Sequence, residues 1–210
     1  MKKKIYVVGG ANYYASFIEN YELVSRIEDA THVIFTGGED VDPSLYGEKK
    51  HPTTYSNIAR DLEEKEIFEK INPSQIVIAI CRGSQLMCIL NGGKLIQHVE
   101  NHALYGTHPI IDSTTEQVYE ITSTHHQMQF PYRLPNNHYK ILMFSRCQGK
   151  GYYGLELNQD ELFQLQCFEP EVVLYTVPNK PKCLAIQGHP EIMNSNAPII
   201  TKLNEIINSL

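Results

Sequence analysis

Cys81 stands where an apolar strand ends and a helix begins. Residues 76–80 are β-branched or apolar, which is typical of a strand buried on both faces of a parallel sheet. Gly83 and the helix-compatible run 84–90 follow the cysteine. This order of strand, tight turn, nucleophile and helix predicts a nucleophile elbow, in which the positive end of the helix favours a reactive thiolate. A buried structural cysteine is the alternative, because free cysteine is among the most buried residue types.

A histidine and a carboxylate lie two residues apart near the end of the chain. His189 and Glu191 flank Pro190 and follow the short apolar run 183–186. A cysteine nucleophile needs a base that takes its proton, and the base needs a third group that fixes its tautomer. A lone His-x-Glu pattern is a weak indication, but together with the elbow it predicts a Cys81–His189–Glu191 triad.

A glycine pair follows another apolar run, residues 33–36. Glycine at the carboxyl end of a strand lets the backbone approach a ligand and direct an N–H group at it. Acyl transfer needs such donors for the developing oxyanion. We expect the N–H groups of Gly38 and Arg82 to form this oxyanion hole. An ordinary Gly-Gly turn is the alternative.

With these three segments, the sequence resembles the class I glutamine amidotransferase superfamily, and within it the γ-glutamyl hydrolase-like branch, peptidase C26. Residues 79–85 are similar to the family pattern Gly-x-Cys-x-Gly-x-Gln, with Ala79 where glycine is usual. The other segments that resemble family motifs are residues 37–43 with Tyr46-Gly47, residues 188–191, Arg60-Asp61 with Glu64, and residues 123–127. A second departure is the brief region before the glycine pair.

The resemblance implies hydrolysis of a γ-glutamyl amide, most simply that of glutamine, through a thioester on Cys81. It implies that Gln85 contacts the glutamyl group, that His126 contacts the substrate, and that no metal or organic cofactor is required. In an amidotransferase the ammonia passes to a partner synthetase. In a free-standing γ-glutamyl hydrolase the chain acts alone on a glutamylated amine or peptide.

A non-hydrolytic role is a further alternative. Related flavodoxin-like folds also carry an elbow cysteine that acts as a redox sensor, and some domains of this shape only bind partners. Neither role predicts a histidine and a carboxylate matched to the elbow, so the pair at residues 189 and 191 favours the hydrolase.

Composition narrows the class of protein. At 210 residues with a hydrophobic fraction of 42%, the chain is expected to form one domain, residues 1–210. A net charge of −6 argues against non-specific binding of nucleic acid. No apolar run is long enough to cross a bilayer. Five cysteines without paired spacing do not indicate a disulfide framework, so a cytoplasmic location is expected.

Strand and helix patterns alternate along the chain, which predicts an α/β fold with a mostly parallel sheet. The resemblance implies a flavodoxin-like three-layer sandwich, in which ligands bind at the carboxyl ends of the strands. The expected strands are residues 4–9, 22–25, 32–36, 76–80, 116–121, 139–145 and 172–177, and the expected helices are residues 12–20, 57–71, 84–90 and 196–210. Residues 155–169 have no clear pattern.

For two polar clusters we prefer an interpretation without a functional role. Arg60, Asp61 and Glu64 lie on neighbouring turns of the helix expected at 57–71, and we interpret them as a solvated, salt-bridged face. The spacing of His98, Glu100 and His102 suggests a zinc site. We reject that site because closed zinc sites usually have tightly paired ligands with supporting cysteines, and Cys88 is expected in the core.

Overall fold

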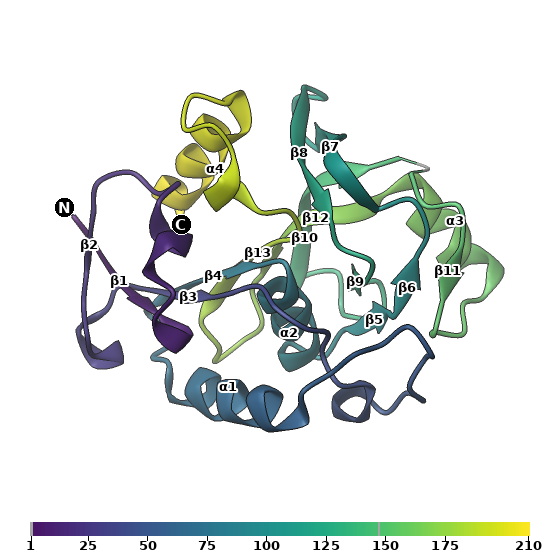
Figure 1. The fold of residues 1–210 in the computed structure, drawn as a ribbon, viewed down its shortest axis with the longest axis horizontal. Coiled ribbons are helices and arrows are strands. Elements are labelled where there is room, and N and C mark those ends of the chain that lie inside the picture. The colour runs from purple at the N-terminus through teal and green to yellow at the C-terminus, as the bar shows by residue number, and fades with distance from the viewer. Residues whose placement is uncertain (1, 147) are drawn as a thin grey trace.

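The fold is built around a nine-stranded sheet with the strand order β2-β1-β3-β4-β13-β12-β10-β7-β8 (Figure 1). A computed structural model describes residues 2–146 and 148–210, apart from the side chain of Tyr105. The strands of this sheet are β1 (Lys3–Val7), β2 (Tyr21–Leu23), β3 (His32–Phe35), β4 (Ile76–Ile80), β7 (Ala103–Asp112), β8 (Val118–Thr124), β10 (Tyr139–Ser145), β12 (Glu169–Tyr175) and β13 (Lys182–Ile186).

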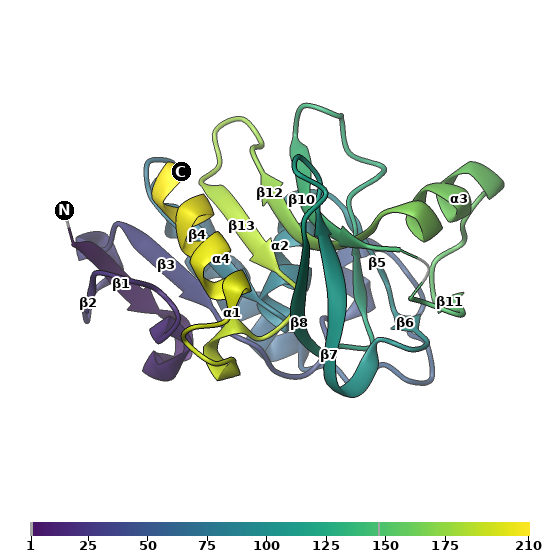
Figure 2. The same ribbon diagram turned by 90° about the horizontal axis from the view of Figure 1, so that it is seen from above.

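The sheet has a parallel half and an antiparallel half. The pairs β1–β2, β1–β3, β3–β4 and β4–β13 are parallel. The pairs β12–β13, β10–β12, β10–β7 and β7–β8 are antiparallel, and the last forms a long hairpin (Figure 2). Two short pairs lie outside the main sheet: β5 (Lys94–Ile96) with β9 (Met128–Phe130), and β6 (His98–Val99) with β11 (Tyr152–Tyr153).

Helices cover both faces of the parallel half, as the flavodoxin-like expectation required (Figure 1). Helices α1 (Ile58–Lys70) and α2 (Arg82–Leu90) lie on one side, and α4 (Pro198–Ser209) lies on the other. Alternate residues of β4 serve the two layers, because side chains of a strand point to opposite faces. Ile78 belongs to the core cluster that contains Leu203 of α4, whereas Val77 belongs to the cluster that contains Leu86 of α2. The α/β three-layer fold is confirmed.

Local sequence accounts for most helix boundaries. The Asn57 side chain accepts a hydrogen bond from the Arg60 N–H at 3.3 Å, which caps α1 where the sequence predicted. Helix α3 (Gln159–Cys167) lies in the segment that had no clear pattern. It begins with a capping box, in which Asn158 and Glu161 satisfy each other's backbone N–H groups.

Several expected elements differ from the structure in type or bounds, and two of them illustrate the reasons. Residues 12–20 are not one α-helix: a 3₁₀ turn spans Asn12–Ala15, and the bonds join residues three apart, such as Ser16 N to Tyr13 O. The strand expected at 116–121 begins later, because Glu116 has φ 60° in the turn of the hairpin. It then continues through Thr124.

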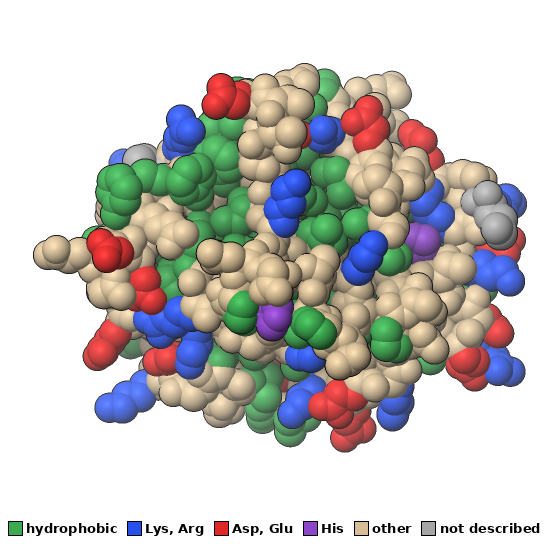
Figure 3. All heavy atoms as spheres, turned by 180° about the vertical axis from the view of Figure 1, so that it is seen from behind, with side chains coloured by type: hydrophobic (Ala, Val, Ile, Leu, Met, Phe, Trp, Pro, Cys, Tyr) green, Lys and Arg blue, Asp and Glu red, His purple; other side chains and the backbone are tan. Residues whose placement is uncertain are grey.

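The surface and the helices bear on the class of protein. On the face shown in Figure 3, hydrophobic side chains gather in the upper half, and charged side chains lie mostly around them. Within residues 2–146 and 148–210, no helix combines the length and the apolar composition needed to cross a membrane.

Candidate active site

Cys81 occupies a sharp turn between β4 and α2. Its backbone has φ 52° and ψ −110°, a conformation that residues with a side chain rarely adopt. The Cys81 N–H donates to the Ile186 carbonyl at 2.8 Å, and the Ser84 hydroxyl donates to the Cys81 carbonyl at 2.6 Å. These bonds from β13 and α2 hold the strained residue, as expected for a nucleophile elbow.

Close packing explains the glycine after the cysteine. A Cβ atom on Gly83 would lie 2.5 Å from the Phe35 carbonyl oxygen, so any other residue would push α2 away from β3. The methyl group of Ala79, where the family pattern has glycine, is fully buried in β4 between β3 and β13. The alanine is therefore accommodated without changing the strand.

His189 and Glu191 lie just after β13. The His189 Nδ1 atom is 2.7 Å from Glu191 Oε1, and the His189 N–H donates to the Thr122 hydroxyl at 2.6 Å. Burial disfavours the imidazolium, but hydrogen bonds and charge from Cys81 and Glu191 outweigh it and raise the pKa of His189 to about 10. The imidazole therefore lies between the thiol and the carboxylate.

Gly37 shows how closely these groups converge. A Cβ atom there would lie 2.9 Å from His189 Cε1, 3.6 Å from Cys81 Cβ and 2.8 Å from the Tyr14 hydroxyl. The backbone after β3 therefore passes close to both the histidine and the cysteine, and a side chain at Gly37 would collide with the histidine. The three segments meet at the carboxyl ends of parallel strands, which is where ligands bind in folds of this kind.

A cavity of about 180 Å³ opens beside Cys81. The residues that line it are Gly38, Glu39, Asp40, Tyr55, Cys81, Gln85, Thr124, His125, His126 and Gln127. Gln85 and His126, both expected at the substrate, are among them. Gln85 Nε2 donates to the Gln127 carbonyl at 3.3 Å, and His126 Nε2 lies 3.0 Å from Asp40 Oδ1.

Gly38 adopts a backbone conformation that favours glycine, with φ 152°. A Cβ atom there would lie 2.1 Å from Arg60 Nη1, and Arg60 Nη2 donates to the Gly37 carbonyl at 3.0 Å. The Arg60 guanidinium thus supports the glycine loop. Gly38 lines the same cavity as Cys81, while Arg82 begins α2 directly after it.

Comparison with known proteins identifies the family of this chain. The family model for peptidase C26 matches residues 4–136. The chain belongs to the peptidase C26 family.

Individual relatives of this peptidase C26 chain match parts or most of it. It is 35% identical to protein NtpR of Enterococcus hirae over 78 residues, which span 36% of the chain and 33% of NtpR. It is 28% identical to the glutamine amidotransferase-like protein YvdE of Lactococcus lactis over 187 residues, which span 83% of the chain and 69% of YvdE.

One solved structure shares the fold along nearly the whole chain. A candidate GMP synthase subunit from Thermoplasma acidophilum superposes with a TM-score of 0.54 at 14% identity, covering 99% of this chain and 98% of that one.

The burial of Asp61 and Glu64 in α1 contradicts the interpretation of these residues as part of a solvated face. Asp61 and Glu64 are 0% and 4% exposed, so they do not form a solvated face. Both carboxylates pair with the Arg82 guanidinium, which is itself buried. Arg60 joins the same network through its Nε, 2.8 Å from Glu64 Oε1. In this peptidase C26 protein the network therefore ties α1 to the residue that follows Cys81.

Several residues of the site were not foreseen. Asp40 and Tyr55 line the cavity, and the Tyr55 N–H donates to Asp40 Oδ2 at 2.9 Å. Tyr14 packs near His189, with 6.4 Å between the two ring centroids. Asp40 lies within the glycine-loop motif and could have been found there, but nothing in the sequence around Tyr14 or Tyr55 indicates an active site.

The rejected zinc trio is not brought together. His98 packs against the rings of His51 and Tyr153, and Glu100 Oε1 accepts from the Tyr153 hydroxyl at 3.3 Å. His102 turns instead toward two other histidines. Cys88 is fully buried, as expected.

Proposed function

We propose that this peptidase C26 protein hydrolyses a γ-glutamyl amide, most simply that of glutamine, through a thioester on Cys81. The observation that carries the proposal is the position of His189, whose Nδ1 lies 2.7 Å from Glu191 Oε1 and whose ring lies beside Cys81 at the same glycine loop. A base oriented by a carboxylate and paired with a strained elbow cysteine fits nucleophilic acyl transfer.

Each residue has a defined part in the proposed reaction. His189 takes the thiol proton, and the Cys81 sulfur attacks the γ-carbonyl carbon. The backbone N–H groups of Gly38 and Arg82 hold the oxyanion. The C–N bond then breaks as His189 protonates the leaving nitrogen. Gln85 contacts the glutamyl group within the cavity that it shares with Cys81.

Water completes the cycle by the same route in reverse. It attacks the thioester carbon while His189 takes its proton, and the Cys81 sulfur leaves and is reprotonated. The products are glutamate and ammonia, or glutamate and an amine. Glu191 holds the tautomer of His189 throughout. These residues perform the cycle without a metal or an organic cofactor.

The fate of the nitrogen separates two versions of the proposal. A glutamine amidotransferase would pass ammonia to a partner synthetase, and the Thermoplasma protein that shares the fold is itself a candidate GMP synthase subunit. A free-standing γ-glutamyl hydrolase would release an amine. The second version is favoured by the peptidase C26 match and by the cavity position of Thr124 and His126.

The test is glutamate release from glutamine and from a chromogenic γ-glutamyl anilide. We expect wild-type protein to turn over at least one substrate, and Cys81→Ala and His189→Ala each to lower the rate by about a thousandfold. Cys167→Ser, which changes a half-buried cysteine outside the site, is the matched control and should keep the wild-type rate. Preference for glutamine favours the amidotransferase, and preference for the anilide favours the hydrolase.

Intact-mass measurement decides the case in which both substrates are inert. A glutamine-analogue electrophile should add one label to wild-type protein and none to Cys81→Ala. Absence of any label on wild-type protein would contradict the thioester mechanism. Ready oxidation of Cys81 by peroxide with no labelling would instead support a redox sensor.

A further inference from the structure

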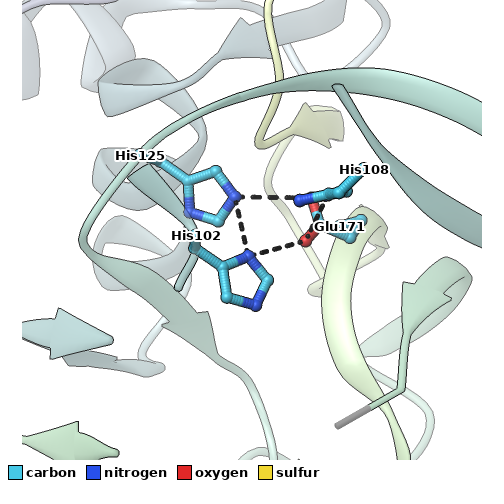
Figure 4. Close-up of side chains that lie close together, drawn as sticks. All are labelled: His102, His108, His125 and Glu171. Carbon is cyan, nitrogen blue, oxygen red and sulfur yellow. Dashed lines mark hydrogen bonds and ion pairs between the residues drawn. The ribbon is translucent and has the colours of Figure 1, made fainter. Parts of the chain in front are cut away.

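Three histidines and a glutamate meet inside the antiparallel half of the sheet. His102 immediately precedes β7, His108 lies within it, His125 follows β8, and Glu171 lies in β12. Their exposed fractions are 0%, 2%, 2% and 0%. The three imidazoles and the carboxylate point toward one another (Figure 4), and one ligand atom from each lies within 4.8 Å of the others.

Hydrogen bonds fix the proton on the outer nitrogen of two of the rings. The Ser123 hydroxyl donates its single proton to the His102 carbonyl at 2.5 Å, so it accepts at 2.9 Å from His108 Nδ1–H. His125 Nδ1 lies 2.9 Å from the Gln127 carbonyl, which only accepts, and so carries its proton there. In the neutral rings, the Nε2 atoms of His108 and His125 are left with lone pairs.

The third ring is held less tightly. His102 Nε2 lies 3.4 Å from Glu169 Oε2 and has no hydrogen-bond partner among the described residues. A proton on Nε2, on the side of this carboxylate, leaves the lone pair on Nδ1. That Nδ1 atom is 3.3 Å from His125 Nε2 and 3.4 Å from Glu171 Oε1. With this tautomer in all three rings, three lone pairs and a carboxylate face one point in the protein interior, an arrangement that a cation at that point, either a metal ion or a proton, would stabilise.

The spacing suits a tetrahedral ion. Zinc binds nitrogen at about 2.0–2.1 Å, so the edges of a ZnN₃O tetrahedron are about 3.3 Å long. Besides the two distances from His102 Nδ1, His108 Nε2 lies 3.1 Å from Glu171 Oε1, and His125 Nε2 lies 3.6 Å from the other carboxylate oxygen, Oε2. The four ligand atoms lie within 4.8 Å of one another, so the cluster would contract around a bound ion. Neither His108 Nε2 nor Glu171 Oε2 has a hydrogen-bond partner among the described residues.

Glu171 needs a positive partner more than its neighbour Glu169 does. Both are fully buried, but Glu169 accepts hydrogen bonds from the Gln148 and Gly149 N–H groups and from the Tyr152 hydroxyl. Glu171 Oε1 accepts from the Ser145 hydroxyl at 3.1 Å, and its Oε2 has no partner among the described residues, so a cation beside Glu171 would offset its charge. Imidazole ligands favour Zn²⁺ and its first-row neighbours over Mg²⁺ and Ca²⁺, which prefer oxygen. An outer carboxylate, carbonyl or hydroxyl on each ring is the usual support of a metal-bound histidine.

We propose that His102, His108, His125 and Glu171 form a closed, structural Zn²⁺ site that fastens the β7–β8 hairpin to β12. The site departs from the expectation that no metal is required, and it shares only His102 with the trio rejected from the sequence. Its four protein ligands leave no open position for substrate, so its role is structural.

The metal would also order one wall of the candidate active site. His125 lines the cavity beside Cys81, and the carbonyl of the nearby Gln127 accepts from Gln85. On the other side, the Glu171 carbonyl accepts from the Gln187 N–H at 2.8 Å, two residues before His189. This link to activity rests on the proposed function, whereas the metal site itself does not.

The test measures metal in the whole protein after removal of any histidine-rich tag. Wild-type protein that is stripped with a chelator, reloaded with Zn²⁺ and dialysed should hold about one equivalent and melt about 5–10 °C higher than the stripped form. His108→Asn and His125→Asn should lose most of the metal. His98→Asn, outside the cluster, should keep it.

Cobalt supplies a readout that needs no variant to fold. Co²⁺-loaded wild-type protein should show the intense visible absorption of tetrahedral coordination, with no thiolate charge-transfer band, and Zn²⁺ should displace it. Wild-type protein that retains less than about a tenth of an equivalent of either ion would overturn the site, as would full retention by His108→Asn and His125→Asn. Bound metal with an unchanged melting temperature would overturn the structural role. Glutamate release is read separately, so its absence leaves these results intact.

Discussion

Two groups of histidine and carboxylate lie in this protein, and they differ in access. The side chain of His189 is 17% exposed and lies close to Cys81, which lines the cavity, whereas His102, His108 and Glu171 are buried in the antiparallel half together with His125, the one member of that group that borders the cavity. Under the two proposals, the same residue types exchange protons with a substrate in one place and hold an ion in another. The exposure of the side chains, rather than residue type, is the difference between the proposed catalytic site and the proposed structural site.

The largest effect that would sharpen this comparison is expected from Glu191→Gln. Loss of the carboxylate removes the partner that orients His189, so glutamate release should fall by about a hundredfold or more, while Zn²⁺ content stays at the wild-type value. Glu205→Gln on the exposed face of α4 is the matched control. A wild-type rate in Glu191→Gln would remove Glu191 from the triad.

The Glu191→Gln variant should also change how the free energy of unfolding depends on pH. The folded-state pKa of His189, about 10, lies above the ordinary value of 6.5. Its contribution to stability is therefore complete below about pH 6.5 and is lost as the pH rises through about 10. Without Glu191, the loss should occur at lower pH. Denaturant unfolding between pH 6 and 10, with an NMR titration of the imidazole, would detect the shift.

A second prediction concerns the buried network beneath the elbow. Arg82→Met leaves the buried Asp61 without its cation and Glu64 with Arg60 alone, so the free energy of unfolding should fall by about 3–5 kcal/mol. Arg26→Met is the control, because Arg26 pairs with Glu28 and Asp29 on the surface and its loss should cost less than about 1 kcal/mol. Equal losses in urea unfolding would contradict the distinction between buried and exposed pairs.

The smallest effect is expected from neighbouring histidines that belong to different groups. His126→Ala removes a cavity contact and should raise KM by about 3- to 10-fold with little change in kcat or Zn²⁺ content. His125→Asn should instead lower the Zn²⁺ content. His138→Ala, outside both groups, is the control. Metal loss in His126→Ala would break the proposed division between these two residues.

Much of the fold could be read from local patterns. Strands β4 and β10 have the predicted bounds, and α1 begins after its predicted cap at Asn57. Helix α3 escaped because it buries only Leu165, so it has almost no apolar period. The antiparallel half of the sheet was not foreseen, since strand pattern alone does not give pairing direction.

The candidate site also has features that could be predicted from the sequence and features that could not. Cys81, His189 and Gly38 each follow the end of a strand, and parallel strands bring such ends to one edge of the sheet. Their convergence could therefore be predicted. The burial of Asp61 and Glu64 could not, because it depends on the Arg82 side chain reaching them from another helix.

The sequence by itself determined the order strand, cysteine, helix and the spacing of His189 and Glu191, because these are relations within a few consecutive residues. Only the tertiary structure decided which histidines meet. His125 and His126 are adjacent in the chain, yet one joins the buried cluster and the other contacts Asp40. The register of β7 against β8, and the pairing of β10 with both β7 and β12, bring His102, His108 and Glu171 to His125. Such contacts between residues far apart in the chain are set by backbone pairing, which no local pattern specifies.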